Sequence, residues 1–387
     1  MAEAPVIQVL FLVFVGAAVL AALALQARQS LLVAYVLAGV AAGEHGFNLI
    51  PPSVNVADIG QAGIIFLLFL LGLNLHPQKL ARLLGPATRV TVASGLASMA
   101  ITLPIAMVFD FSVAEAIFIG VALSFSSTII GLKLLPTTAL HHRHVGELII
   151  SILLLQDIIA IVLLLVIQAA GEGGWYGPLL PLVSLPCLAL LAWLLSRWVL
   201  IPVLAKFDTI PEYLFLATIG WCLLGAEGAH AMGLSHEMGA FVAGVALAAN
   251  PVATFISEQL KPLRDFFLIL FFFALGAALP IWSLGDVVLP GLALAVAILV
   301  AKPRIYAWLI ARNGEPPRLA REVGVRLGQA SEFSLLVTVM AASAGVVSNR
   351  VDLVVQAATL ITFIASSYIV MNRYPTPISV NEQLRQN

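Results

Sequence analysis

Long apolar runs alternate along the chain with short polar breaks, many of which contain proline or glycine. Such runs predict membrane-spanning helices, because about 20 apolar residues in a helix cross a bilayer. The chain holds about thirteen of them: Val6–Leu25, Leu31–Ala42, Ile59–Leu75, Ala87–Phe109, Val113–Leu135, Leu148–Ala170, Leu179–Ile201, Tyr213–Ala226, Met238–Ala249, Phe266–Ile281, Val287–Ala311, Leu319–Ala344 and Val351–Met371. The pattern predicts an all-α polytopic membrane protein.

The composition supports this class. Of the 387 residues 61% are hydrophobic and only 10% are charged, which excludes a soluble globular protein, and the net charge of -1 offers no basic surface for nucleic acid. The first run lacks a basic segment before it and is too long for a signal-peptide core, so we expect it to remain a span. Cys187 and Cys222 lie within apolar runs, which predicts packing roles rather than a disulfide.

The basic residues predict the orientation of the spans. If the N-terminus lies outside, nearly all of the 19 lysines and arginines fall in inner loops or the C-terminal tail, and Arg350 falls in an outer loop. Lys302, Arg304 and Arg326 are left within spans. This asymmetry follows the positive-inside rule. We therefore expect a bacterial inner (plasma) membrane protein with an external N-terminus and a cytoplasmic C-terminus.

The second half of the chain repeats a glycine pattern of the first half. Gly72 and Gly276 stand 204 positions apart, as do Gly120 and Gly324, while Gly39 and Gly244 stand 205 apart. The offset covers seven predicted helices, an odd number, so the second copy enters the membrane in the opposite direction. Inverted repeats are common in secondary transporters, whose substrate site lies near the midplane between broken helices.

Polar clusters interrupt the fifth and the twelfth predicted span at equivalent depths. The first cluster contains Ser124, Ser126, Ser127 and Thr128, and the second runs from Gly328 to Ser334 and contains Glu332. We expect both helices to be unwound there and to cross, which would expose carbonyls and half-helix ends as cation ligands. The alternative is that the serines bond to neighbouring carbonyls within intact helices.

Asp157 lies at the middle of the sixth predicted span, next to Gln156. A carboxylate at this depth costs about +2.5 to +3.5 kcal/mol on insertion scales, so it normally faces a partner or a water-filled cavity. One interpretation makes Asp157 a buried hydrogen-bond anchor between helices. We favour the other, in which it is a protonatable ion site beside the two unwound segments.

Lys302 is the cationic counterpart in the eleventh predicted span, and Pro303 follows it. A buried ammonium pairs with an acid or loses its proton, and the candidate acids are Glu332 and Asp157. Alternatively, Lys302 braces the unwound backbone. Arg326 is a second candidate partner for Glu332, and these residues alone leave the pairing open.

Other features point to no enzyme and no cofactor beyond the transported ions. His141, His142 and His144 form a loop for which a solvated surface is favoured over a metal site, since no acidic or cysteine partner is near. A membrane-embedded enzyme built on this loop would lack paired catalytic groups. Ala253–Arg264 is expected to be a short amphipathic interfacial helix.

Seven segments resemble the monovalent cation:proton antiporter-2 family, and most closely its Kef-type potassium:proton members. In chain order they are FLLFLLGLNL (66–75), ALSFSSTII (122–130), LLLQDIIAI (153–161), FVAGVALAANP (241–251), LKPLRDFFLILFFFALGAAL (260–279), AKPRIY (301–306) and LGQASEFSLL (327–336). They extend over nearly the whole chain.

The resemblance implies an antiporter fold of the NhaA/NapA type. Its transport core would comprise about 87–170 and 287–371, and its dimerisation scaffold about 6–75 and 179–281. It further implies a homodimer that works by elevator-type alternating access. The family's ion-binding acid matches Asp157, with Gln156 beside it. Ser126, Ser127 and Thr128 match the first broken helix, Glu332 the second, and Lys302 the core lysine.

Two departures refine this expectation. Electrogenic relatives carry Asn-Asp or Asp-Asp where this chain has Gln156-Asp157, as Kef-type members do. With one titratable carboxylate, a proton would compete with potassium (favoured) or sodium, and the exchange would be electroneutral.

Kef-type proteins usually continue into a nucleotide-binding regulatory domain. Either this sequence is a piece of a longer protein, or a separate cytoplasmic subunit regulates it. The rival reading is a potassium efflux channel of the same fold.

Overall fold

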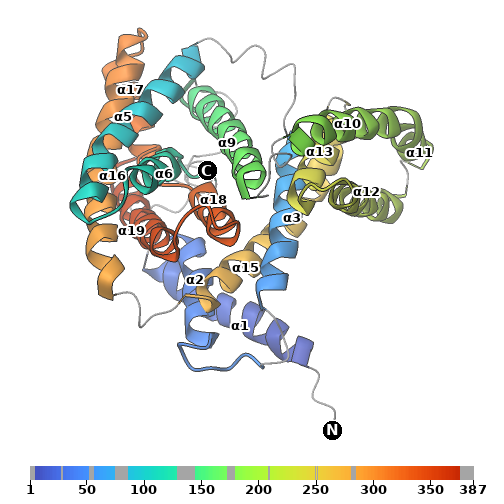
Figure 1. Ribbon diagram of the computed structural model, residues 1–387, viewed down its shortest axis with the longest axis horizontal. Coiled ribbons are helices and arrows are strands. Elements are labelled where there is room, and N and C mark those ends of the chain that lie inside the picture. Colours follow the sequence, from blue (N-terminus) through green and yellow to red (C-terminus); the bar gives the residue numbers. More distant parts are fainter. Residues whose placement is uncertain are drawn as a thin grey trace. The chain divides into compact units, whose positions relative to one another are not determined.

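A computed structural model describes residues 5–27, 29–51, 56–74, 86–128, 144–171, 179–207, 210–248, 250, 252–279 and 285–374. The elements in these ranges are helical (Figure 1): α1 Pro5–Gln26, α2 Leu31–Ala42, α3 Val56–Asn74, α5 Pro86–Val108, α6 Val113–Ser124, α9 His144–Gly171, α10 Leu179–Leu195, the π-helical turn η1 Ser196–Leu200, α11 Ile201–Lys206, α12 Pro211–Ala231, α13 His236–Ala248, α14 Val252–Gln259, α15 Lys261–Ala277, α16 Gly285–Arg312, α17 Pro317–Arg326, α18 Glu332–Ser343 and α19 Asn349–Arg373.

The helical, membrane-type architecture predicted from the apolar runs is confirmed. Within the described ranges, six helices are long and apolar enough to cross a membrane, and several apolar helices are shorter. The number of spans stays a prediction. One boundary was wrong: the expected interfacial helix Ala253–Arg264 is divided at Leu260, and α15 begins at Lys261, before the predicted start of the tenth span. Pro262 explains this, because proline suits the first turn of a helix but not its interior.

The chain divides into two compact units. One comprises Met1–Ala18, Tyr35–Arg82 and Gln168–Leu279, and the other comprises Val19–Ala34, Leu83–Ile167 and Pro280–Asn387. We call them the first and the second unit. Whether the second unit is the transport core and the first unit the dimerisation scaffold stays a prediction.

Glycines in the first unit allow two pairs of helices to approach closely. A methyl group at Gly39 of α2 would overlap the carbonyl oxygen of Phe273 in α15, and one at Gly244 of α13 would overlap that of Phe69 in α3. Phe273 follows Phe69 by 204 positions and Gly244 follows Gly39 by 205. The two contacts are therefore repeat-related copies of one packing arrangement.

The reciprocal contacts obey the same relation. A methyl group at Gly72 of α3 would overlap the carbonyl oxygen of Phe241, and one at Gly276 of α15 would overlap that of Val36. Phe241 and Val36 are again 205 positions apart. The internal repeat found in the sequence is thus seen in the packing, because α2 and α3 of the first copy contact α15 and α13 of the second copy.

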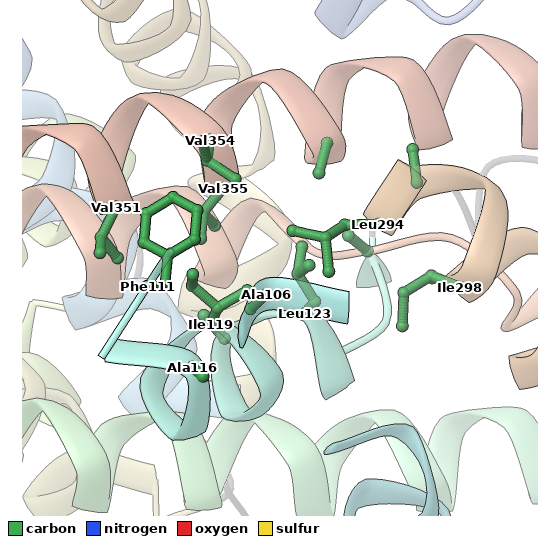
Figure 2. Close-up of a cluster of buried hydrophobic side chains, with 14 of the residues drawn as sticks. Ala106, Phe111, Ala116, Ile119, Leu123, Leu294, Ile298, Val351, Val354 and Val355 are labelled. Carbon is green, nitrogen blue, oxygen red and sulfur yellow. The ribbon is translucent and has the colours of Figure 1, made fainter. Parts of the chain in front are cut away.

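The second unit has an apolar core between α5, α6, α16 and α19. Figure 2 shows Phe111 beside Val351 and Val355 of α19, and Leu123 beside Leu294 of α16. A separate cluster joins α9 to α16 and α17, with Ile149, Ile152, Leu153, Tyr306, Ile310, Val323 and Leu327 among its members. These two clusters fix the helices that carry the predicted site residues.

The sequence Ser112-Val113-Ala114-Glu115 sets the start of α6. Ser112 accepts from the Glu115 amide and the Glu115 carboxylate accepts from the Ser112 amide, which forms a capping box. Ser348, the N-cap residue of α19, donates its hydroxyl proton to Glu115 at 2.6 Å. The first turns of α6 and α19 are therefore tied together.

Both predicted helix breaks are present. The helix α6 ends at Ser124, and Phe125 has the extended backbone angles φ -66° and ψ 150°. The helix α17 ends at Arg326, and α18 begins only at Glu332. The last part of the fifth predicted span, residues 129–135, lies outside the described residues, as do His141 and His142.

Candidate functional site

Asp157 lies on α9, and only 2% of its surface is exposed. The preceding turns of α9 are anchored in the apolar cluster with α16 and α17. The Thr128 hydroxyl, just beyond the first break, donates to the Asp157 carboxylate, 3.3 Å from Oδ1 and 3.4 Å from Oδ2. The carboxylate and this hydroxyl together offer three oxygen atoms at one buried place.

Gln156 holds the broken end of α6 through its side-chain amide. Its Oε1 accepts from the Ser126 amide at 3.0 Å, and its Nε2 donates to the Ser124 carbonyl at 3.3 Å. The same Nε2 donates to the Tyr306 hydroxyl of α16 at 2.7 Å. An amide can serve a donor and an acceptor at once, which a carboxylate cannot. Gln156 therefore supplies a helix end with the hydrogen bonds it lost at the break.

Lys302 is fully buried on α16 and contacts main-chain carbonyls. Its Nζ donates to Phe125 at 2.5 Å, to Gln329 at 2.9 Å and to Leu123 at 3.4 Å. The last carbonyls of a helix lack partners and carry negative partial charge, so an ammonium stabilises them. Of the two interpretations, bracing of the unwound backbone is the one that these contacts support, in place of a pairing with Glu332 or Asp157.

The two broken helices contact each other directly. Ser126 donates its hydroxyl proton to the Leu327 carbonyl at 2.9 Å, and Ser334 of α18 donates to the Ala122 carbonyl of α6 at 2.5 Å. The Ser127 side chain is buried, and its carbonyl accepts from Gln329 Nε2 at 3.5 Å. The two broken helices are therefore joined by hydrogen bonds, and these involve hydroxyl and carbonyl groups at or next to the two breaks.

Arg326, at the end of α17, pairs with an acid other than Glu332, the candidate partner that the sequence suggested. Arg326 makes an ion pair with Glu322 on the same helix, with Nη2 2.8 Å from Oε1. Glu332 occupies the first position of α18, after the N-cap residue Ser331, where a carboxylate is favoured by the helix dipole. It is also close enough for its charge to act on Asp157.

Sequence reasoning gave no role to Tyr306, Gln329 or Ser366. Gln329 is fully buried, and its Oε1 accepts from the Ser366 hydroxyl of α19 at 3.0 Å. The polar cluster had included Gln329, and a buried glutamine at mid-span requires partners. Tyr306 and Ser366 could have been suspected only as the polar residues of otherwise apolar helices near the same depth.

The comparison with protein families gives a clear result. The family described as "Sodium/hydrogen exchanger, transmembrane" matches residues 10–371. The chain belongs to this family. The match runs from α1 to the last turns of α19, so it includes both breaks and every predicted site residue.

Individual relatives agree with the family. The chain is 29% identical over 382 residues to K(+) efflux antiporter 5 of Arabidopsis thaliana, with 92% of this chain and 64% of the relative covered. It is 31% identical over 356 residues to the glutathione-regulated potassium-efflux system protein KefC of Salmonella heidelberg, with 87% and 55% covered. It is 28% identical over 351 residues to the iron transporter MagA of Paramagnetospirillum magneticum, with 88% and 79% covered. The chain thus spans little more than half the length of the potassium-efflux relatives.

A solved structure shows the same fold. The sodium proton antiporter MjNhaP1 of Methanocaldococcus jannaschii matches with a TM-score of 0.69 at 15% identity, and 98% of each chain is covered. The antiporter fold expected from the resemblance is thereby confirmed.

Proposed function

We propose that this protein is a secondary transporter that exchanges a monovalent cation for a proton, and that both bind at Asp157. The observation that carries the proposal is the pair of Asp157 and Thr128. An acid that is 2% exposed inside a helical membrane unit lies beside a hydroxyl donor and the unwound end of α6. Intramembrane acids of this kind mark ion pathways.

The surroundings of Asp157 favour a cation as its ligand. Carboxylate, hydroxyl and carbonyl oxygens can replace the hydration shell of an alkali ion. The Lys302 ammonium donates to three carbonyls, so its charge is engaged in holding the two breaks. Asp157 then remains the group that can alternate between a proton and a cation.

The same arrangement supports electroneutral exchange. Gln156 has no proton to release, so only one carboxylate of the Gln156-Asp157 pair titrates. One proton replaced by one monovalent cation leaves the charge of the site unchanged. When a proton or a monovalent cation neutralises the carboxylate, the site crosses the bilayer at lower cost than a bare carboxylate would. This suits elevator-type movement of the second unit within a homodimer.

Potassium is the proposed substrate, with sodium as the competing ion. The support is the names of two relatives, a K(+) efflux antiporter and a potassium-efflux system protein. The matched region covers 64% and 55% of two potassium-efflux relatives, so these relatives contain a further part. We propose that a cytoplasmic regulatory domain or subunit controls this chain.

The decisive experiment uses liposomes that contain a pH-sensitive dye and the purified protein. Addition of potassium should dequench the dye, with no dependence on membrane potential, and Asp157→Asn should abolish the response. Asp352→Asn is the control, because it removes a half-buried carboxylate of the second unit outside the site. Potassium flux without proton movement would instead support the channel reading, and exchange retained in Asp157→Asn would refute the site.

A further inference from the structure

A cavity of about 350 Å³ opens among α16, α17 and α19 of the second unit. Its walls are apolar, with Leu299 and Ala307 from α16, Val325 from α17 and Ile369 from α19. This volume is within the range of small-molecule sites. No part of the site at Asp157 lines it.

Three arginines converge on this apolar cavity. Arg304, Arg321 and Arg373 each come from a different helix, and all three side chains are exposed. Among the described residues that line the cavity there is no carboxylate. The acid nearest in sequence, Glu322, already pairs with Arg326. The described lining of the cavity therefore carries an excess of positive charge.

These features define the ligand by its chemistry. Guanidinium groups bind phosphate oxygens in bidentate geometry, and an apolar wall behind them suits an acyl chain rather than a hydrated ion. Basic pockets between transmembrane helices bind the headgroups of anionic lipids. We propose that this cavity binds an anionic phospholipid, with the phosphate at the three arginines and the start of one acyl chain against α16 and α19.

The lining of the cavity also includes residues next to the second break. Pro303 lines the cavity directly after Lys302, and Gly328 lines it between Leu327 and Gln329. Ser366, which bonds to Gln329, also lines it. A bound lipid would fill the space behind the unwound segment, so it should stabilise the second unit.

The test measures lipid binding and thermal stability of the full purified chain in detergent, and needs no transport. Phosphatidylglycerol should raise the melting temperature, whereas phosphatidylcholine should not. In Arg321→Gln/Arg373→Gln the half-effective lipid concentration should rise about tenfold or more, since two charge-assisted contacts are lost.

The control is Arg312→Gln/Arg318→Gln, which removes the same charge from neighbouring exposed positions of α16 and α17 that do not line the cavity. It should respond as the parent does. Ile369→Trp, which narrows the cavity and keeps all three arginines, should also lose the lipid response. Equal responses in both double variants, an unchanged response in Ile369→Trp, or a full shift with inorganic phosphate alone would each overturn the proposal. Because these readouts are independent of exchange, failure here leaves the proposed transport function standing.

Discussion

The Lys302 ammonium lies 2.5 Å from the carbonyl oxygen of Phe125, the first residue beyond α6. It lies 2.9 Å from the carbonyl of Gln329, within the break between α17 and α18. One cation thus stabilises the unwound segments of both repeats. Its contacts give carbonyls of both unwound segments a partner inside an apolar unit, where an unsatisfied carbonyl would be costly.

Lys302→Met should therefore destabilise the protein strongly. Methionine keeps the length of the side chain but removes the charge and all three donors, so buried carbonyls lose their partner. We expect a loss of about 1–3 kcal/mol or more, since each buried carbonyl left without a hydrogen-bond partner carries a cost of this order. The measurement is the melting temperature in detergent. Arg312→Met, an exposed position on the same helix that does not line the lipid cavity, is the control, and a similar small effect in both variants would contradict the bracing role.

Tyr306→Phe should show that the Tyr306 hydroxyl supports the break in α6 and does not take part in ion binding. The substitution deletes the hydroxyl that accepts from Gln156 Nε2 and leaves the Thr128–Asp157 contact in place. We expect a loss of about 1–3 kcal/mol in stability, the cost of an unsatisfied buried polar group. The apparent affinity for potassium should change less than twofold. A large change in affinity with unaltered stability would place Tyr306 in the ion site instead.

The sequence predicts the architecture of this protein well because its signals are local. Apolar runs, the repeated glycines and the polar interruption at Ser126–Thr128 each identify an element without knowledge of its neighbours. The glycine spacing also anticipates which helices form equivalent packing contacts. Mid-span position alone was sufficient to single out Asp157 and Lys302.

The partners of these polar residues could not be predicted in the same way. Acidic residues can be identified in a sequence, so acids were the candidate partners of Lys302. Every residue has a main-chain carbonyl, so the sequence does not indicate which carbonyls Lys302 contacts. Arg326 pairs with Glu322 four positions earlier, a helical spacing that was overlooked in favour of the more distant Glu332. Gln156 was predicted to belong to the ion site because it adjoins Asp157, and this stays a prediction. Its contacts with α6 and α16 could not be foreseen, because neighbours on a helix point in different directions.

The repeat-related glycine contacts make a paired prediction about packing. Gly39→Ala and Gly244→Ala should each lower the melting temperature by similar amounts, because each added methyl group would overlap an equivalent carbonyl oxygen. A cost of about 1–3 kcal/mol is typical for overpacking. Gly220→Ala in α12 is the matched control, since a methyl group there meets no atom within 4 Å. It should be neutral or stabilising by up to about 1 kcal/mol. Markedly unequal effects of the first two variants would argue against equivalent packing in the two copies.

Thr128→Val tests whether the hydroxyl beside Asp157 belongs to the ion site. Valine preserves the shape of the side chain and removes the donor that lies 3.3 Å from Oδ1. If the hydroxyl oxygen is a ligand of the cation, its removal weakens potassium binding. A loss of about 1.4 kcal/mol corresponds to a tenfold rise in the potassium concentration for half-maximal exchange. Thr128→Ser should stay near the parent value, because it keeps the hydroxyl. Thr338→Val is the control for loss of a buried hydroxyl, since Thr338 bonds to the Ser334 carbonyl of its own helix, away from Asp157. If Thr128→Val and Thr338→Val had the same potassium dependence, the Thr128 hydroxyl would hold the carboxylate in place without binding the ion.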